Sequence, residues 1–165
     1  MPQTLVAIDP GRSGAIVHWK QGMGDPRVQA MPDSDQAAVK ALQEIDIQEA
    51  DLCILGIEKP PRFTGAQLPG SRIALLFQNF GALFGAATAL EWEVRMFMPQ
   101  SWQKGFSLGS SAGLQRSVWK AKLKAVAIGL YPRTKVTNDN ADALLILHHL
   151  RTVLSSAVVL ADDHD

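Results

Sequence analysis

The sequence lacks most of the features that mark secreted or membrane-bound proteins. Its single cysteine, Cys53, cannot form an internal disulfide, and because it lies in an apolar run we expect it in the core. The first residues have neither the charged nor the apolar segment of a signal peptide. The longest apolar stretch, residues 73–90, is interrupted by Gln78, Asn79 and two glycines, which argues against a membrane span. We therefore expect a cytoplasmic protein that does not contact a membrane.

Several motifs that identify common active sites are also missing. The chain has no phosphate-binding Walker loop, no Gly-x-Ser-x-Gly nucleophile turn and no Gly-x-Gly-x-x-Gly sequence. Cysteine and histidine do not occur at zinc-binding spacings, and the adjacent His148 and His149 cannot share one helix face. These absences predict no nucleotide cofactor and leave carboxylates as the strongest candidates for chemistry.

The composition is that of one folded domain. Hydrophobic residues make up 47% of the 165 residues and charged residues 19%, which excludes a disordered chain. We find no internal repeat. We expect a single domain over residues 1–158 and a frayed acidic tail over residues 159–165.

Acidic residues are absent from one long segment, although the net charge of the whole chain is zero. Between Val94 and Asn138 the only charged residues are basic: Arg95, Lys104, Arg116, Lys120, Lys122, Lys124, Arg133 and Lys135. One interpretation is a surface that binds phosphates. The other is a solvated helix face whose counter-charges come from the first half of the chain.

The order of predicted elements indicates an α/β protein. Apolar runs bounded by Gly, Pro and Asp predict strands, and apolar residues at helical spacing predict helices. The predicted strands are 4–8, 14–19, 27–31, 51–58 and 93–98; the predicted helices are 37–45, 72–91, 114–130 and 139–154. This order predicts a mixed five-stranded sheet flanked by helices, in an RNase H-like layout.

Two predicted strands end in a carboxylate. The first strand ends near Asp9, which Pro10-Gly11 follows, and the central strand ends at Glu58, which Lys59-Pro60-Pro61 follows. A carboxylate at the end of a buried strand is costly unless it meets a cation. The alternative for Asp9 is that it only caps the turn.

A second pair of carboxylates begins the last predicted helix. Asp139 and Asp142 are three residues apart, which places them on one helix face about 5–6 Å apart at Cβ. They could simply complement the helix dipole and cap its first turn. The rest of this helix is strongly apolar, so we expect it to pack on the sheet with its first turn near the strand ends.

Together these positions predict a metal site. Asp9, Glu58, Asp139 and Asp142 lie at the ends of elements that can converge, and clustered carboxylates need cations to remain ionised together. Hard divalent ions such as Mg²⁺ or Mn²⁺ prefer oxygen ligands. Two such ions about 3.5–4 Å apart suit in-line displacement at a phosphodiester.

The ordered set of motifs resembles the RuvC-type Holliday-junction resolvases of the RNase H-like superfamily, in particular their phage and organellar-like branches. The resemblance rests on Ile8-Asp9-Pro10-Gly11, on Ile57-Glu58 and on the segment from Asp139 to Leu144, whose spacing spans nearly the whole chain. It implies a bacterial or phage-encoded homodimer that nicks four-way DNA symmetrically. It also implies two Mg²⁺ ions per active site, replaceable by Mn²⁺, held by the four carboxylates.

The resemblance further implies residues that contact DNA. Phe63 is the candidate for an aromatic wedge that opens the junction, with Arg62 beside it for phosphate; alternatively Phe63 fills the core. Lys120 is the candidate lysine near the scissile phosphate. The helix over residues 72–91, with its small residues, resembles a dimer interface. The remaining expected DNA contacts are Arg72, Trp102, Lys104, Arg116, Lys122 and Lys124.

Other functions remain open at this point. The same fold could serve a nuclease acting on other branched DNA or on RNA. The chain could also bind junctions without cutting them. A fragment of the actin-like ATPase fold is a further alternative, which the short chain and the lack of a second Gly-rich phosphate-binding hairpin disfavour.

Overall fold

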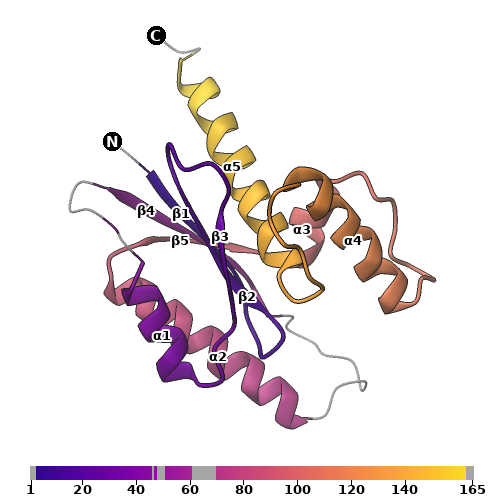
Figure 1. Cartoon of the computed structure of the whole chain (residues 1–165), viewed down its shortest axis with the longest axis horizontal. Coiled ribbons are helices and arrows are strands. Elements are labelled where there is room, and N and C mark those ends of the chain that lie inside the picture. The colour runs from indigo at the N-terminus through magenta and orange to yellow at the C-terminus, as the bar shows by residue number, and fades with distance from the viewer. Residues whose placement is uncertain (1–2, 46, 48–50, 61–69, 163–165) are drawn as a thin grey trace.

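The computed structural model describes residues 3–45, 47, 51–60 and 70–162, and for residues 157–162 it describes the backbone alone. Five strands in these ranges form one mixed sheet in the order β3-β2-β1-β4-β5 (Figure 1). The central β1 is antiparallel to β2 and parallel to β4, and β4 is parallel to β5. The strands are β1 (Gln3–Asp9), β2 (Ala15–Lys20), β3 (Arg27–Ala30), β4 (Leu52–Glu58) and β5 (Glu93–Phe97). The predicted mixed sheet is confirmed.

Helices cover both faces of the sheet (Figure 1). On one face lie α1 (Asp35–Gln43) and α2 (Gly70–Ala89), which also contact each other. On the other face α5 (Ala141–Asp162) packs on β1, β2 and β4, while α3 (Pro99–Lys104) and α4 (Arg116–Leu130) pack against α5. No helix in the described part of the chain is long and apolar enough to cross a membrane.

Successive side chains of β1 point to opposite faces of the sheet, so the hydrophobic core has two parts. Leu5 and Ala7 point toward α5, and Val6 and Ile8 point toward α1 and α2, because successive strand side chains face opposite sides. All four are at most 2% exposed, so β1 is buried on both faces. The carboxylate that ends this strand is therefore anchored by the most deeply buried element of the sheet.

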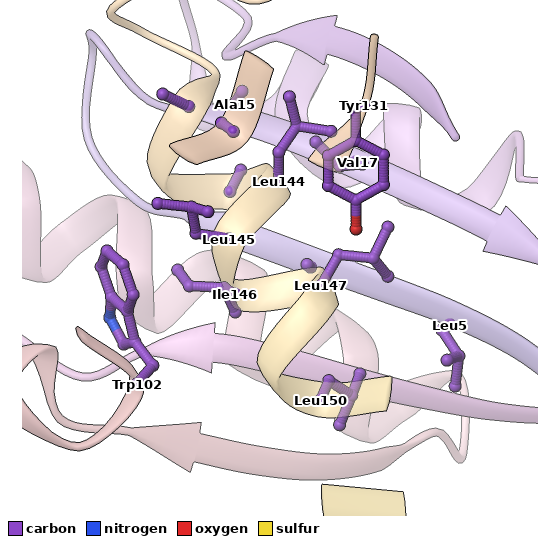
Figure 2. Close-up of a cluster of buried hydrophobic side chains, with 14 of the residues drawn as sticks. Leu5, Ala15, Val17, Trp102, Tyr131, Leu144, Leu145, Ile146, Leu147 and Leu150 are labelled. Atoms are coloured by element: carbon purple, nitrogen blue, oxygen red, sulfur yellow. The ribbon is translucent and has the colours of Figure 1, made fainter. Parts of the chain in front are cut away.

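The first half of α5 is buried on nearly every side. Residues 141–147 are all buried, whereas an ordinary surface helix has one exposed face. Figure 2 shows the reason: Leu144, Leu145 and Leu147 radiate from the helix into a cluster with Trp102 of α3 and Tyr131. The sheet covers one side of α5 and the α3 and α4 layer covers the other.

Two elements differ from the sequence prediction. The short helix α3 was not predicted, because Pro99 reads as a break; the structure places it at the first helical position, where proline needs no hydrogen-bond partner for its nitrogen. The last helix continues to Asp162 rather than ending at Leu154. The predicted tail boundary at residue 159 therefore falls inside α5, and residues 163–165 lie outside the described ranges.

Candidate active site

Asp9 and Glu58 lie side by side at one edge of the sheet. The parallel pairing of β1 and β4 places Ile8 opposite Ile57, and the carboxylates are the next residue on each strand. Both strands end at these residues, Asp9 and Glu58. The parallel register therefore brings two acidic side chains from distant parts of the sequence to neighbouring positions.

The turn after Asp9 is held by glycines and by an asparagine from α2. A Cβ at Gly14 would lie 1.9 Å from the main-chain oxygen of Asp9, and Gly11 has a φ of +105°, which favours glycine. The Gly11 N–H donates to Oδ1 of Asn79 at 2.9 Å, and Nδ2 of Asn79 donates to Asp35 at 3.1 Å. These contacts fix the turn, and hence Asp9, relative to α1 and α2.

The first turn of α5 supplies a third carboxylate, Asp142, which is 6% exposed. The loop before it is ordered by Asn140, whose Oδ1 accepts the N–H of Thr137 at 2.8 Å and whose Nδ2 donates to the carbonyl of Lys135 at 3.0 Å. These side-chain hydrogen bonds satisfy main-chain groups of the loop that leads into the helix. They set where α5 begins and therefore where Asp142 lies.

Lys120 of α4 pairs with Asp142. Its Nζ donates a hydrogen bond to Oδ2 of Asp142, in a partly buried ion pair. The other oxygen, Oδ1, is buried and has no hydrogen-bond partner among the described residues. An unsatisfied carboxylate oxygen inside a protein is unfavourable, and it is the kind of atom that a bound cation would satisfy.

Glu58 has a partner that the sequence did not predict. The indole Nε1–H of Trp102 donates to Oε2 of Glu58 at 2.8 Å, and the Trp102 side chain is 0% exposed. The expectation that Trp102 contacts DNA does not fit this burial, because the side chain has no surface to offer. Trp102 instead orients a carboxylate of the site, and α3 is the element that places it there.

Burial and mutual repulsion act together on the pKa values of these carboxylates. Burial raises the pKa of Asp9 well above its usual range, and the charges of Glu58 and Asp142 raise it further, while Lys120 and Arg116 oppose the change. Burial likewise raises the pKa of Glu58 to about 7, against the lowering effect of the Trp102 N–H. Three carboxylates from three segments of the chain thus interact electrostatically.

The same surroundings also change the pKa of Lys120, but there the nearby charges outweigh burial. Burial lowers the pKa of the Lys120 ammonium, but attraction and hydrogen bonding to Asp142, together with the charges of Asp9 and Glu58, raise it above its usual value overall. Lys120 is therefore positively charged at neutral pH.

Asp139 is not part of the buried cluster. It lies exposed in the turn before α5, and it is not among the charges that alter the pKa of Asp9 or Glu58. The structure therefore brings together Asp9, Glu58 and Asp142 of the four predicted carboxylates and leaves Asp139 at the rim.

The three carboxylates have the chemistry that a hard divalent cation needs, but they are not arranged as a ready-made binding site. Their oxygens are the ligands that Mg²⁺ and Mn²⁺ prefer. Oδ1 of Asp142, which has no hydrogen-bond partner among the described residues, could accept a bond from such an ion. In the part of the chain that is described, however, no three His, Cys, Asp or Glu side chains form a ready metal-binding group. Side-chain rotation would therefore have to accompany metal binding.

The predicted basic contacts fall into two groups. Arg116, Lys120 and Lys124 follow one another at four-residue intervals on α4, and Arg116 is close enough to lower the pKa of Asp9. Lys104, Lys122 and Arg72 are exposed on the surface. Arg62 and Phe63 lie outside the described residues, so their predicted roles stay predictions.

The two histidines lie among aromatic side chains. His149 packs edge-on against Phe97 with ring centroids 4.8 Å apart, and His148 packs on Phe106 at 5.7 Å. Burial lowers the pKa of both imidazoles. These contacts support a packing role for the pair.

Comparison with known proteins adds a likeness of fold. No protein-family model matches the chain, and no curated protein matches it. Among solved structures, Thermus thermophilus RuvC in complex with a Holliday junction substrate matches with a TM-score of 0.55 and 13% identity, covering 88% of this chain and 91% of that one. Another T. thermophilus RuvC structure matches with a TM-score of 0.52 and 14% identity, covering 88% and 92%. The chain therefore has a RuvC-like fold, and the predicted fold is confirmed.

Proposed function

We propose that this protein is a metal-dependent endonuclease that resolves four-way DNA junctions by paired, symmetric nicks. The observation that carries the proposal is the convergence of Asp9, Glu58 and Asp142 with Lys120 at the carboxyl ends of β1 and β4. The proposal is also supported by the similarity of this fold to that of a RuvC bound to a Holliday junction substrate.

Asp9, Glu58 and Asp142 would hold the metal ions, with Asp139 at the rim as a further ligand. We propose Mg²⁺ as the natural ion, two per site, with Mn²⁺ as a substitute. When bound, such ions would supply an activated water for attack on phosphorus and would stabilise the leaving oxygen, the chemistry that leaves a 5′-phosphate and a 3′-hydroxyl.

The protein's own residues bind and orient the reacting groups. The Trp102 N–H holds one oxygen of Glu58, which restricts the rotation of that carboxylate. The Lys120 ammonium is charged and lies at the edge of the acidic cluster, where it can stabilise negative charge on a phosphate oxygen. Burial of the cluster strengthens both interactions because little water screens them.

The substrate would lie along the basic side of α4. Arg116, Lys120 and Lys124 form a row that leads from the acidic cluster, and phosphate contacts of this kind position DNA without reading its sequence. Lys104, Lys122 and Arg72 would add contacts at the periphery, and Phe63 with Arg62 would open the junction. This charge distribution predicts binding that weakens as salt increases.

Two active sites are needed for paired nicks, so we propose a homodimer formed through α2. Phe77 of this helix is 45% exposed, and Gly81 and Gly85, four and eight residues further along the same side, are exposed and would allow another helix to approach closely. The helix carries no charged residue between Ile73 and Leu90. An exposed apolar surface of this kind is typical of an interface.

The test is cleavage of an end-labelled, immobile four-way DNA junction in Mg²⁺, with EDTA and a linear duplex as controls. Asp9→Asn should abolish cutting, while Asp33→Asn, an exposed aspartate before α1, should leave it unchanged. Paired nicks on opposite strands that require metal and Asp9 would support the proposal. A junction that is bound but remains intact in both Mg²⁺ and Mn²⁺ would instead show a junction-binding protein.

A further inference from the structure

Helix α4 has two apolar faces, although the fold uses only one of them. Its inner face packs on α5 through Leu123 and Ala127, which are 1% and 0% exposed. Its outer face carries Val118 and Ile128, which are 44% and 49% exposed. Figure 1 shows α4 at the periphery of the molecule, so this outer face is directed away from the sheet.

The outer residues have the spacing of a helix-binding seam. Val118, Ala121, Ala125 and Ile128 are all exposed and recur at intervals of three and four residues, as in a heptad repeat, and Leu114 continues the pattern just before the helix begins. With 3.6 residues per turn, this stripe lies about 140–220° around the helix from Leu123. It runs for about 15 Å between Val118 and Ile128, with small alanines at its centre and branched residues at its ends.

Packing among the residues that the structure describes does not explain the stripe. A helix at the surface of a globular protein normally has polar residues opposite its buried face, since apolar residues there gain nothing from folding. Here the position opposite the core is occupied by Val, Ala, Ala and Ile in succession. Contiguous exposed apolar side chains of this kind mark a binding surface for another protein, and helix-in-groove or helix-on-helix recognition is the mode that matches their spacing.

The charges beside the stripe determine which partner fits. Lys122 and Lys124 flank it on its two sides, at the positions that face a partner's flanking residues in a paired helix, and no acidic residue occurs between Val94 and Asn138. A second copy of α4 would offer only basic and neutral residues beside these lysines, with no carboxylate to pair with them, which disfavours self-pairing. DNA is also a poor occupant, because Arg116 and Lys120 lie on the opposite side of the helix, toward the acidic cluster.

We propose that the outer face of α4 binds an amphipathic helix of another protein, one whose apolar stripe is flanked by acidic residues. Val118 and Ile128 would be the apolar anchors, and Lys122 and Lys124 would pair with the partner's carboxylates. Lys122 and Lys124 are also proposed DNA contacts, so the partner and DNA would share these two lysines, whereas Arg116 and Lys120 on the opposite side of α4 would serve DNA alone. The proposal does not depend on the nuclease activity.

The test uses a synthetic probe and the full chain. The probe is a fluorescent peptide of about three heptads with Leu at the a and d positions and Glu at the e and g positions, compared with a scrambled peptide of the same composition. We expect saturable binding by fluorescence anisotropy. The dissociation constant should rise about tenfold or more for Val118→Glu/Ile128→Glu, and should also rise for Lys122→Glu/Lys124→Glu. Met96→Glu, at a residue 47% exposed on β5, is the matched control and should bind as the unaltered protein does.

Three further readouts distinguish the proposal from its alternatives. Val118→Glu/Ile128→Glu should keep the sedimentation behaviour of the unaltered protein, and the uncharged Val118→Ser should keep its junction affinity and junction cleavage, because it adds no charge beside Lys122 and Lys124. Equal binding of the scrambled peptide, or no saturable binding, would overturn the proposal. Loss of self-association in Val118→Glu/Ile128→Glu would instead identify a second copy as the occupant, and loss of junction affinity in Val118→Ser would identify DNA. Val118→Ser, which adds no charge, provides a milder variant in which the rise in dissociation constant should persist.

Discussion

At the scale of single residues, the proposed site depends on partners that hold each carboxylate in place. Asp9 is positioned by a turn in which Gly14 has no room for a Cβ, Glu58 by the Trp102 N–H, and Asp142 by Lys120. None of these partners is itself acidic. Two of them, Gly14 and Trp102, are residue types that do not by themselves suggest catalysis.

Trp102→Phe should make cleavage more dependent on pH. The substitution keeps most of the buried ring and removes the N–H that favours the ionised form of Glu58, so the pKa of Glu58 should rise above about 7. A smaller fraction of Glu58 is then ionised at pH 7, and cleavage there should fall about tenfold, with recovery at pH 9. The measurement is the pH–rate profile together with the Mg²⁺ dependence at each pH.

Trp119→Phe is the matched control for that experiment. The Trp119 indole donates to Gln103 at 3.3 Å rather than to a carboxylate, so its removal should leave the pH–rate profile in place. An equal loss of activity at every pH in Trp102→Phe would contradict the assigned role and indicate a packing defect instead.

Lys120→Gln should separate chemistry from binding. Loss of a charged donor that stabilises developing negative charge lowers rates by about 10²–10³-fold in comparable sites, and we expect that range for the single-turnover rate at saturating protein. Lys122→Gln, on another side of α4, should weaken junction binding and its salt dependence while keeping the saturated rate. If the two variants lose rate and affinity in the same proportion, Lys120 is only one of several phosphate contacts.

At the scale of elements, sequence patterns predicted most of the fold. Apolar runs bounded by proline, glycine and aspartate located all five strands, and the carboxylates at the ends of β1 and β4 were found for the same reason. The short helix α3 was missed because Pro99 can either end a strand or begin a helix. The contact of Trp102 with Glu58 was missed with it, since that contact exists only once α3 is placed.

For the basic helix α4, the orientation of its charged side chains was harder to predict than the helix itself. Its positive charges were visible in the sequence, and the family resemblance pointed to Lys120, but residue spacing alone does not tell which of them faces the acidic cluster. Lys120 pairs with Asp142 because α4 packs against α5 through Leu123 and Ala127. Likewise, the spacing of Asp139 and Asp142 suits a shared helix face, and only the exact start of α5 makes one buried and the other exposed.

Phe77→Glu should dissociate the proposed homodimer. A charge at the centre of an apolar helix interface must either be desolvated or keep the two helices apart. We expect sedimentation analysis to show a monomer, and cutting of the two junction strands should lose its coupling, so that singly nicked junctions accumulate. The unaltered protein sedimenting as a monomer at all concentrations would contradict an interface on α2.

Ile128→Glu provides a control of similar exposure. Ile128 is 49% exposed on α4, on the other side of the sheet from α2, so the same charge placed there should leave the sedimentation behaviour unchanged. If Phe77→Glu and Ile128→Glu both lose self-association, the cause is the added charge and not an interface on α2.

At the scale of the whole molecule, the acidic cluster should link stability to pH and to divalent cations. Glu58 has a pKa near 7 in the folded protein and an ordinary value near 4.5 when unfolded, and the pKa of Asp9 is raised in the same direction. A raised folded-state pKa stabilises the fold below the unfolded value, and this contribution disappears as pH rises through the folded value. The metal-free protein should therefore lose stability between about pH 4.5 and pH 7 through Glu58.

A divalent cation should reverse that trend. Mg²⁺ binds ionised carboxylates, so the increase in Tm that it causes should be small at pH 5 and larger at pH 8, where protons no longer compete. The measurement is thermal unfolding in EDTA and in Mg²⁺ across this pH range. Glu58→Gln should flatten the pH dependence in EDTA and reduce the Mg²⁺ effect at pH 8, whereas Glu44→Gln, an exposed change at the end of α1, should alter neither. Equal Mg²⁺ stabilisation at pH 5 and pH 8 would contradict a cation site built on these buried carboxylates.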